Sequence, residues 1–132
     1  GAFLLMIREF KIFGIGVEPS VYLSQYARST NSVNVLTGVL EDQNLKNNHF
    51  DLITFWDVIE HIDQPENTLK IVKKKLNNSG HLIINVPMID TIPAKLLGKF
   101  WPFYLNVHLW YFDIKSLDQF LLSNGFKRIY VD

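Results

Sequence analysis

Cysteine is absent from the 132 residues of this chain. Its absence excludes disulfide bonds, thiolate zinc sites and a cysteine nucleophile, and it is compatible with a reducing cytoplasm, where we expect the protein to act. Long hydrophobic runs are missing too, so we expect no membrane-spanning helix, which needs about 20 apolar residues. The N-terminal segment includes Arg8, Glu9 and Lys11 and does not resemble a signal peptide.

An excess of one charge is also lacking, because 13 basic residues balance 13 acidic ones. The distribution is uneven, since residues 1–66 hold four Lys/Arg and nine Asp/Glu, whereas residues 67–132 hold nine and four. Nucleic-acid binding is not expected, because the lysines at 73–75 have no aromatic platforms beside them and are best explained as solvated. A hydrophobic content of 48% is sufficient for the core of one domain over residues 1–132.

Helical and strand patterns alternate along the chain. The expected strands cover residues 11–18, 33–37, 50–56, 81–86 and 126–131. Between them, helices are expected to begin after the N-cap residues Ser20, Asp63 and Asp113. Gly80, in the left-handed conformation, and Gly125 are expected to end helices. This alternation predicts a doubly wound, three-layer α/β fold with mostly parallel strands.

The segment Phe50–His61, with the sequence FDLITFWDVIEH, is the most informative part of the chain. Its apolar residues Leu52, Ile53, Phe55 and Trp56 predict a strand that is buried on both faces. The polar residues that follow fall where a parallel strand reaches its carboxyl end, which is the edge where open α/β sheets bind ligands. The segment therefore predicts both a fold class and the location of a site.

Two features near the N-terminus bear on nucleotide binding. Glu18 ends a predicted strand 17 residues after Gly1, and a carboxylate at about this distance accepts both ribose hydroxyls in nucleoside sites. Alternatively, Glu18 is a solvated acid at a strand end. The tripeptide Gly14-Ile15-Gly16 lacks the third glycine of the dinucleotide motif and lies inside a predicted strand, so NAD binding is not expected.

Four segments, in this order, resemble class I S-adenosylmethionine (SAM) dependent methyltransferases, in the group that includes quinone-biosynthesis methyltransferases. They are GVEPS (16–20), FDLITFWDVIEHI (50–62), LNNSGHLIINVP (76–87) and HLWYFDIKSLDQFLLSNGF (108–126). The resemblance implies a Rossmann-like fold, SAM as the cofactor and methyl transfer to a small-molecule acceptor. Only the end of the family's glycine-rich turn is recognisable, at residues 1–4, so its first strand, and also its last, are expected to be missing. The alternative is a non-catalytic Rossmann-like fragment, or an assembly module, without SAM affinity.

The resemblance assigns cofactor contacts in the first part of the chain. Gly1 lies in the turn that approaches the methionine part of SAM, and Glu18, followed by Pro19, binds the ribose. Leu40 covers a face of the adenine ring, and Glu41 accepts from its exocyclic amine. The alternative for Leu40 and Glu41 is a loop without a ligand.

The resemblance also assigns roles after the third predicted strand. Trp56 and Asp57 lie near the methionine and sulfonium end of SAM. His61 and His108 are the candidates for contact with the acceptor. His61 acts either as a base, because imidazole titrates near neutral pH, or as a hydrogen-bonding residue that orients the turn. We favour orientation, because methyl transfer depends on alignment, and no metal site is expected.

The acidic residues predict the charge of the cofactor. Five of them are expected at one edge of the sheet, namely Glu18, Glu41, Asp42, Asp57 and Glu60. A negative site attracts the sulfonium and ammonium of SAM, whereas it repels a cofactor that carries phosphate.

The segment from Phe100 to Phe112 is aromatic at seven of its 13 residues. In the family it would form a lid over the acceptor, and the alternative is a satellite core packed on the sheet. Membrane contact through Trp101, Trp110 and the nearby lysines is less favoured. A missing first strand would leave two unpaired strand edges. The chain could pair the strands ending at Glu18 and Trp56, or borrow a strand from a second copy as a homodimer.

Overall fold

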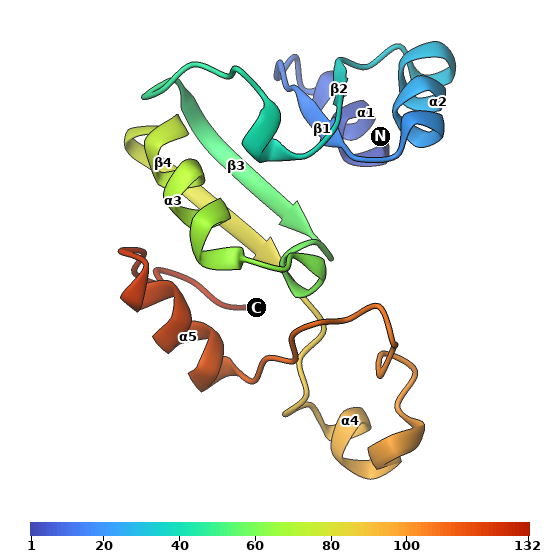
Figure 1. Ribbon diagram of the computed structural model, residues 1–132, viewed down its shortest axis with the longest axis vertical. Helices are drawn as coiled ribbons and strands as arrows, with labels where there is room; N and C mark the ends of the chain where they lie inside the picture. Colours follow the sequence, from blue (N-terminus) through green and yellow to red (C-terminus); the bar gives the residue numbers. More distant parts are fainter. The chain divides into compact units, whose positions relative to one another are not determined.

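The structure is a computed structural model that describes all residues from Gly1 to Asp132. The chain forms two compact units, Gly1–Leu45 and Lys46–Asp132, each built from helices and parallel strands (Figure 1). Each unit contains one two-stranded parallel sheet.

The first unit alternates helix and strand. Its elements are α1 (Ala2–Glu9), β1 (Gly16–Glu18), α2 (Val21–Asn31), β2 (Val35–Thr37) and the 3-10 turn η1 (Leu40–Asp42). The strands pair in parallel, with Gly16 opposite Val35 and Glu18 opposite Thr37. The strand predicted over residues 11–18 is shorter than expected and covers only Gly16–Glu18. Lys11 lies in a turn after α1, with a positive φ of 58°.

The glycines near β1 allow α1 to pack closely on this unit. A Cβ on Gly14 would lie 2.8 Å from Leu4 and 2.9 Å from Ile7, and one on Gly16 would lie 3.0 Å from Leu4. This pair of glycines therefore serves helix packing, which is consistent with the expectation that it does not bind a dinucleotide.

The apolar spacing in α2 predicts that Leu23, Tyr26 and Ala27 share its inner face, and only Ala27 does so in the structure. Leu23 and Tyr26 are each 51% exposed, whereas Ser24 and Ala27 are buried. Ser24 fits there because its hydroxyl donates to the carbonyl oxygen of Val21 and lies 2.8 Å from the Thr37 hydroxyl. A small polar residue with two partners replaces the apolar residue that the pattern predicts. Ser20 caps this helix as expected, accepting from the Leu23 N–H at 3.2 Å.

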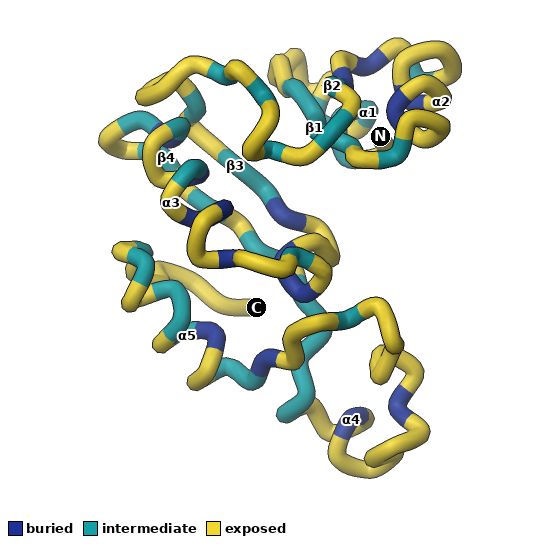
Figure 2. The backbone as a smooth tube through the Cα atoms, viewed as in Figure 1, coloured by how far each residue is buried: buried dark blue, intermediate teal, exposed yellow.

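The second unit contains the longer sheet and the aromatic segment. Its elements are β3 (Phe50–Trp56), η2 (Ile59–His61), α3 (Pro65–Lys75), β4 (Leu76–Asn85), α4 (Ile92–Leu97), η3 (Gly98–Phe100) and α5 (Ile114–Ser123). In Figure 1, α3 lies against the β3–β4 pair. Its inner residues Leu69 and Val72 are fully buried, as their spacing predicts (Figure 2).

One face of the β3–β4 sheet is exposed. The strands pair from Leu52 opposite His81 to Trp56 opposite Asn85. Along β3, Phe55 is buried, whereas Leu52 and Trp56 are 45% and 44% exposed. The expectation that this strand is buried on both faces was therefore wrong, because one layer of helix covers only one face of the pair.

Three expected element ends differ in the structure. The N-cap of α3 is Gln64 rather than Asp63, and no side chain closes the cap. Gly80 lies inside β4 without a positive φ. Glycine is needed there because a Cβ would come within 2.9 Å of the Phe50 carbonyl oxygen. Residues 126–131 form no strand. By contrast, Asp113 caps α5 in a reciprocal capping box with Ser116, and Gly125 has a φ of +80°.

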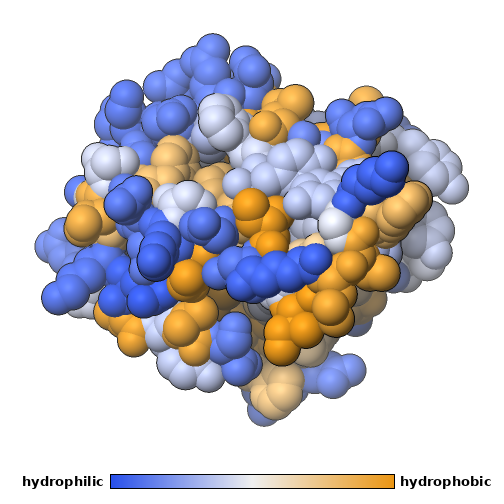
Figure 3. Space-filling model, turned by 90° about the horizontal axis from the view of Figure 1, so that it is seen from below, coloured by the Kyte–Doolittle hydropathy of each residue, from blue (hydrophilic) through white to orange (hydrophobic).

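The segment between β4 and α5 is more ordered than expected. It contains α4 and η3, and its two ends meet in a single bridge between Met88 and Phe112. Ile92, Leu96 and Phe100 are each at least 75% exposed. Seen from this end of the second unit, hydrophobic side chains lie beside charged ones (Figure 3). No helix of the chain combines the length and apolarity needed to cross a membrane.

Candidate functional site

The predicted cofactor residues are divided between the two units. In the first unit, a cavity of about 260 Å³ lies between α1, β1 and α2. Gly1 and Glu18 line it together, with Tyr26, Asn31 and Val35 among the other lining residues. The structure thus brings together two residues that the resemblance assigns to the cofactor, although the sequence separates them by a helix and a turn.

Glu18 stands at the carboxyl end of β1 and is half-buried. One of its carboxylate oxygens, Oε1, accepts from the Ser20 N–H at 2.9 Å, which holds the side chain at the strand end. A carboxylate has about four acceptor positions, so the group can still accept from two hydroxyls of a ribose. Pro19 follows the strand and is exposed.

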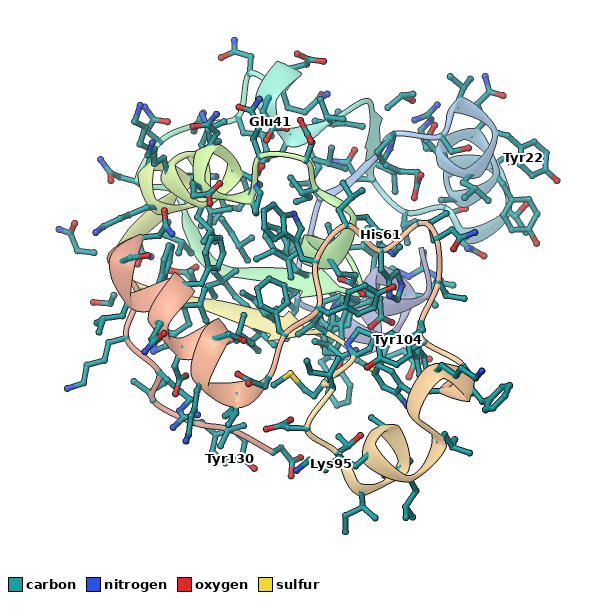
Figure 4. The ribbon with its side chains drawn as sticks, turned by 60° about the horizontal axis from the view of Figure 1, so that its bottom comes forward. Tyr22, Glu41, His61, Lys95, Tyr104 and Tyr130 are labelled. Carbon is teal, nitrogen blue, oxygen red and sulfur yellow. The ribbon has the colours of Figure 1, made fainter.

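The adjacent strand end carries the predicted adenine contacts. The Gly38 N–H donates to the Glu18 carbonyl oxygen at 3.0 Å, so the chain leaves β2 directly beside the end of β1. Leu40 and Glu41 then form η1, with Leu40 half-buried and Glu41 exposed. Figure 4 labels Glu41, and in the same unit Tyr22, which is 73% exposed on α2.

In the second unit, Trp56 and Asp57 lie at the carboxyl end of β3. Asp57 has a positive φ of 51°, and two contacts with Asn85 hold it there. Its N–H donates to the Asn85 carbonyl oxygen at 3.0 Å, and its Oδ1 accepts from Asn85 Nδ2 at 2.9 Å. A backbone in this sparsely populated region at a strand end is common where a protein binds a ligand.

The turn after β3 is joined to the aromatic segment by hydrogen bonds. The Glu60 carbonyl oxygen accepts from the N–H groups of Leu109 at 2.8 Å and Trp110 at 3.2 Å. The indole of Trp110 donates to the Ile62 carbonyl oxygen at 2.7 Å. These bonds place residues 105–111 directly on the turn that contains His61, as Figure 4 shows.

His61 and His108 meet at this junction. Their ring centroids are 4.7 Å apart in an edge-to-face arrangement, and His108 also contacts the ring of Tyr111 at 5.9 Å. His61 Nδ1 lies 2.9 Å from the Val107 carbonyl oxygen, which fixes the ring orientation. The two residues that the sequence proposes for the acceptor are thus side by side, although 46 residues separate them.

Glu60 is the residue whose position the sequence did not predict. It was expected with the other acids at the edge of the sheet, without a prediction of its burial. It is only 1% exposed, and neither carboxylate oxygen has a hydrogen-bond partner. Burial raises the pKa of its carboxyl above the ordinary 4.5, and the charge of Asp57 acts in the same direction, whereas His61 lowers it. Nothing in the FWDVIEH pattern distinguishes this buried acid from the exposed Asp57 beside it.

These features define an α/β protein with a cavity beside an acidic strand end and a polar site at a second strand end. The chain belongs to the methyltransferase domain family, whose model matches residues 1–131. The expected Rossmann-like α/β fold with mostly parallel strands is confirmed by this match and by the solved structures that resemble it. No curated protein matches the sequence.

Three solved structures illustrate the similarity. A SAM-dependent methyltransferase from Thermotoga maritima, described as a possible histamine N-methyltransferase, has 28% identity and a TM-score of 0.73, over 91% of this chain and 57% of that one. One from Archaeoglobus fulgidus has 19% identity and a TM-score of 0.77, over 95% and 56%. A chain from a Haloferax volcanii complex of a methyltransferase with its activator Trm112 has 15% identity and a TM-score of 0.71, over 87% and 51%. The chain thus spans 51–57% of the length of these structures.

Proposed function

We propose that the protein containing this chain transfers a methyl group from SAM to a small-molecule acceptor. Membership of the methyltransferase domain family supports the reaction class. The observation that carries the proposal for this chain is Glu18, a carboxylate at a strand end that lines a cavity and is oriented by the Ser20 N–H. It provides acceptors for the ribose of SAM.

SAM, when bound, supplies an electrophilic methyl group on a sulfonium. The residues of this chain bind and orient the two reactants, because such a displacement depends on alignment and on the exclusion of water. We assign Gly1, Glu18, Pro19, Leu40 and Glu41 to the nucleoside part of the site and Trp56 and Asp57 to the sulfonium end. The acidic side chains favour this cation over a phosphate-bearing cofactor.

We propose that His61 orients the turn at the acceptor site and that His108 contacts the acceptor. The bond between His61 and the Val107 carbonyl oxygen supports an orienting role, since it ties the turn to the aromatic segment. Tyr104 and Tyr111 add aromatic surface beside His108. This supports an acceptor with an apolar or aromatic part, in agreement with the sequence resemblance to quinone-biosynthesis methyltransferases.

Isothermal titration of the chain with SAM tests the proposal. We expect saturable binding by the wild-type chain, and at least about tenfold weaker binding by Glu18→Ala, since a hydrogen bond to a charged group contributes about 1.5–3 kcal/mol. Glu9→Ala is the matched control, because Glu9 is an exposed acid of the same unit outside the cavity. If SAM does not bind, the alternative of a non-catalytic assembly module without SAM affinity gains support. If Glu18→Ala binds SAM as the wild type does, the proposed role of Glu18 is contradicted.

We propose a homodimer, because each small sheet has only two strands and a strand from a second copy would extend it. The complex of the Haloferax volcanii methyltransferase with Trm112 makes a small activator protein a second candidate partner.

A further inference from the structure

Glu60 has a chemical environment that a carboxylate rarely tolerates without a partner. The side chain is 1% exposed, and both oxygens lack a hydrogen-bond donor. Leaving such a group buried and unpaired is costly, so native proteins supply it with a donor or a cation. Within the same junction, the groups that face it are the imidazoles of His61 and His108.

His61 makes the hydrogen bond that is typical of a metal-binding histidine. The Nδ1 atom of His61 contacts the Val107 carbonyl oxygen at 2.9 Å, which favours the tautomer that donates from Nδ1. The lone pair is then on Nε2, the atom that remains available to a metal. Histidines that bind metals almost always donate their other N–H to a carbonyl or carboxylate, which fixes the ring and its tautomer.

We propose that Glu60, His61 and His108 bind a divalent transition-metal ion, with Zn²⁺ as the best-suited occupant. One ligand atom from each residue lies within 4.8 Å of the other two. In a tetrahedral zinc site with bonds of about 2.0–2.1 Å, ligand atoms are about 3.3 Å apart. Small rotations of the three side chains would bring their ligand atoms from within 4.8 Å of one another to the spacing of a zinc site.

The ligand set indicates the class of metal. Two imidazoles and one carboxylate suit Zn²⁺ and other first-row transition ions, whereas Mg²⁺ and Ca²⁺ prefer oxygen ligands alone. Three protein ligands also leave at least one coordination position for water or for an oxygen of another molecule. The site shares His61 and His108 with the proposed acceptor site, but metal binding can be measured without SAM or an acceptor.

A bound ion would link two segments that are distant in the sequence. Glu60 and His61 belong to the turn after β3, and His108 belongs to the aromatic segment. Their backbones are already linked through the Glu60 carbonyl oxygen. Metal binding would add bonds at the same junction, so it should stabilise the fold against heat.

Titration of the untagged, chelator-treated chain with Co²⁺, followed by its visible absorption, and displacement by Zn²⁺ tests the site. We expect one ion per chain. Glu60→Gln and His108→Gln should weaken binding at least about tenfold, since even the loss of an outer-shell partner costs 10–100-fold. Zn²⁺ should raise the melting temperature of the wild type and not that of Glu60→Gln.

His81→Gln is the matched control, because His81 is an exposed histidine on β4 outside the cluster. It should bind as the wild type does. Glu60→Gln replaces a buried charge by a neutral group of the same shape, so we expect it to fold, and circular dichroism checks this. The proposal is overturned if the wild type shows no saturable binding, or if Glu60→Gln and His108→Gln bind the metal as well as the wild type. The metal titration contains no SAM. A chain that binds no metal would therefore not contradict the proposed function, which the SAM titration of Glu18→Ala tests separately.

Discussion

At the scale of single residues, two aspartates show how a side chain controls the backbone around it. Asp57 occupies the left-handed region, where aspartate is several-fold enriched among residues other than glycine. Asp113 begins α5, where its Oδ1 accepts from the Ser116 N–H at 2.7 Å. Asp57 ends a strand next to the proposed site, and Asp113 fixes where the aromatic segment stops.

The cap at Asp113 predicts a dependence of stability on pH. The N–H and hydroxyl of Ser116 hold the pKa of Asp113 below its ordinary 3.8. An acid whose pKa is lower in the folded state stabilises the fold above its unfolded pKa, and this contribution is lost as the pH falls through the folded value. We therefore expect the stability of the wild type to fall more steeply below about pH 3.8 than that of Asp113→Asn. The asparagine side chain still caps α5, but it has no carboxyl group to protonate.

Thermal melts followed by circular dichroism between about pH 5 and pH 2 measure this difference. Asp118→Asn serves as a control on the same helix, because Asp118 contributes an ion pair with Arg128 and no cap. Equal acid sensitivity of the wild type and Asp113→Asn would contradict the predicted role.

At the scale of elements, hydrogen bonds join the turn after β3 to the aromatic segment. The indole of Trp110 donates to the Ile62 carbonyl oxygen, whereas the Tyr111 hydroxyl donates to Leu105 within the segment itself. Trp110→Phe should weaken this junction by about 1 kcal/mol through the loss of one hydrogen bond. Tyr111→Phe is the matched control, because it removes a bond that does not reach the turn.

Hydrogen exchange at the Leu109 amide measures the strength of this junction, because that amide donates to Glu60. We expect about fivefold to tenfold faster exchange in Trp110→Phe, which is the rate equivalent of about 1 kcal/mol if the amide exchanges by local opening. Similar rates in both variants would show that the indole bond does not hold the segment.

Elements with strong local signals were predictable from the sequence. The expected bounds of β3 are correct, because an apolar run meets a polar boundary at each end. Gly80 was misassigned because its role is to allow close approach of Phe50 in the paired strand, and this depends on a partner distant in sequence. The same limit applies to the site. The meeting of His61 with His108 was proposed from resemblance, whereas the burial of Glu60 depends on how a later segment covers the turn.

At the scale of the whole molecule, the edges of the two sheets are the main liability. β1 pairs with β2, and β3 pairs with β4, so each sheet has only two strands. Two-stranded sheets are marginal in isolation, and open edges are sites for pairing with another chain. We therefore expect the chain to associate as its concentration rises.

Size-exclusion chromatography with light scattering tests this association. The mass should increase from 15.4 kDa towards twice that value. Leu52→Lys on β3 should reduce association, because a charge on an edge strand opposes pairing. Leu52→Thr, which keeps strand propensity without charge, should not. A constant mass of 15.4 kDa at all concentrations would contradict the prediction.

The bridge between Met88 and Phe112 has a consequence for the diversification of this protein. Because it joins the two ends of the intervening segment, the residues between them form an insert whose entry and exit are fixed. Closing a longer loop costs little, about 0.6 kcal/mol for each doubling of its length. The segment can therefore be lengthened, shortened or exchanged between relatives while β4 and α5 keep their places, so new acceptor preferences can evolve or be engineered there without redesign of the core.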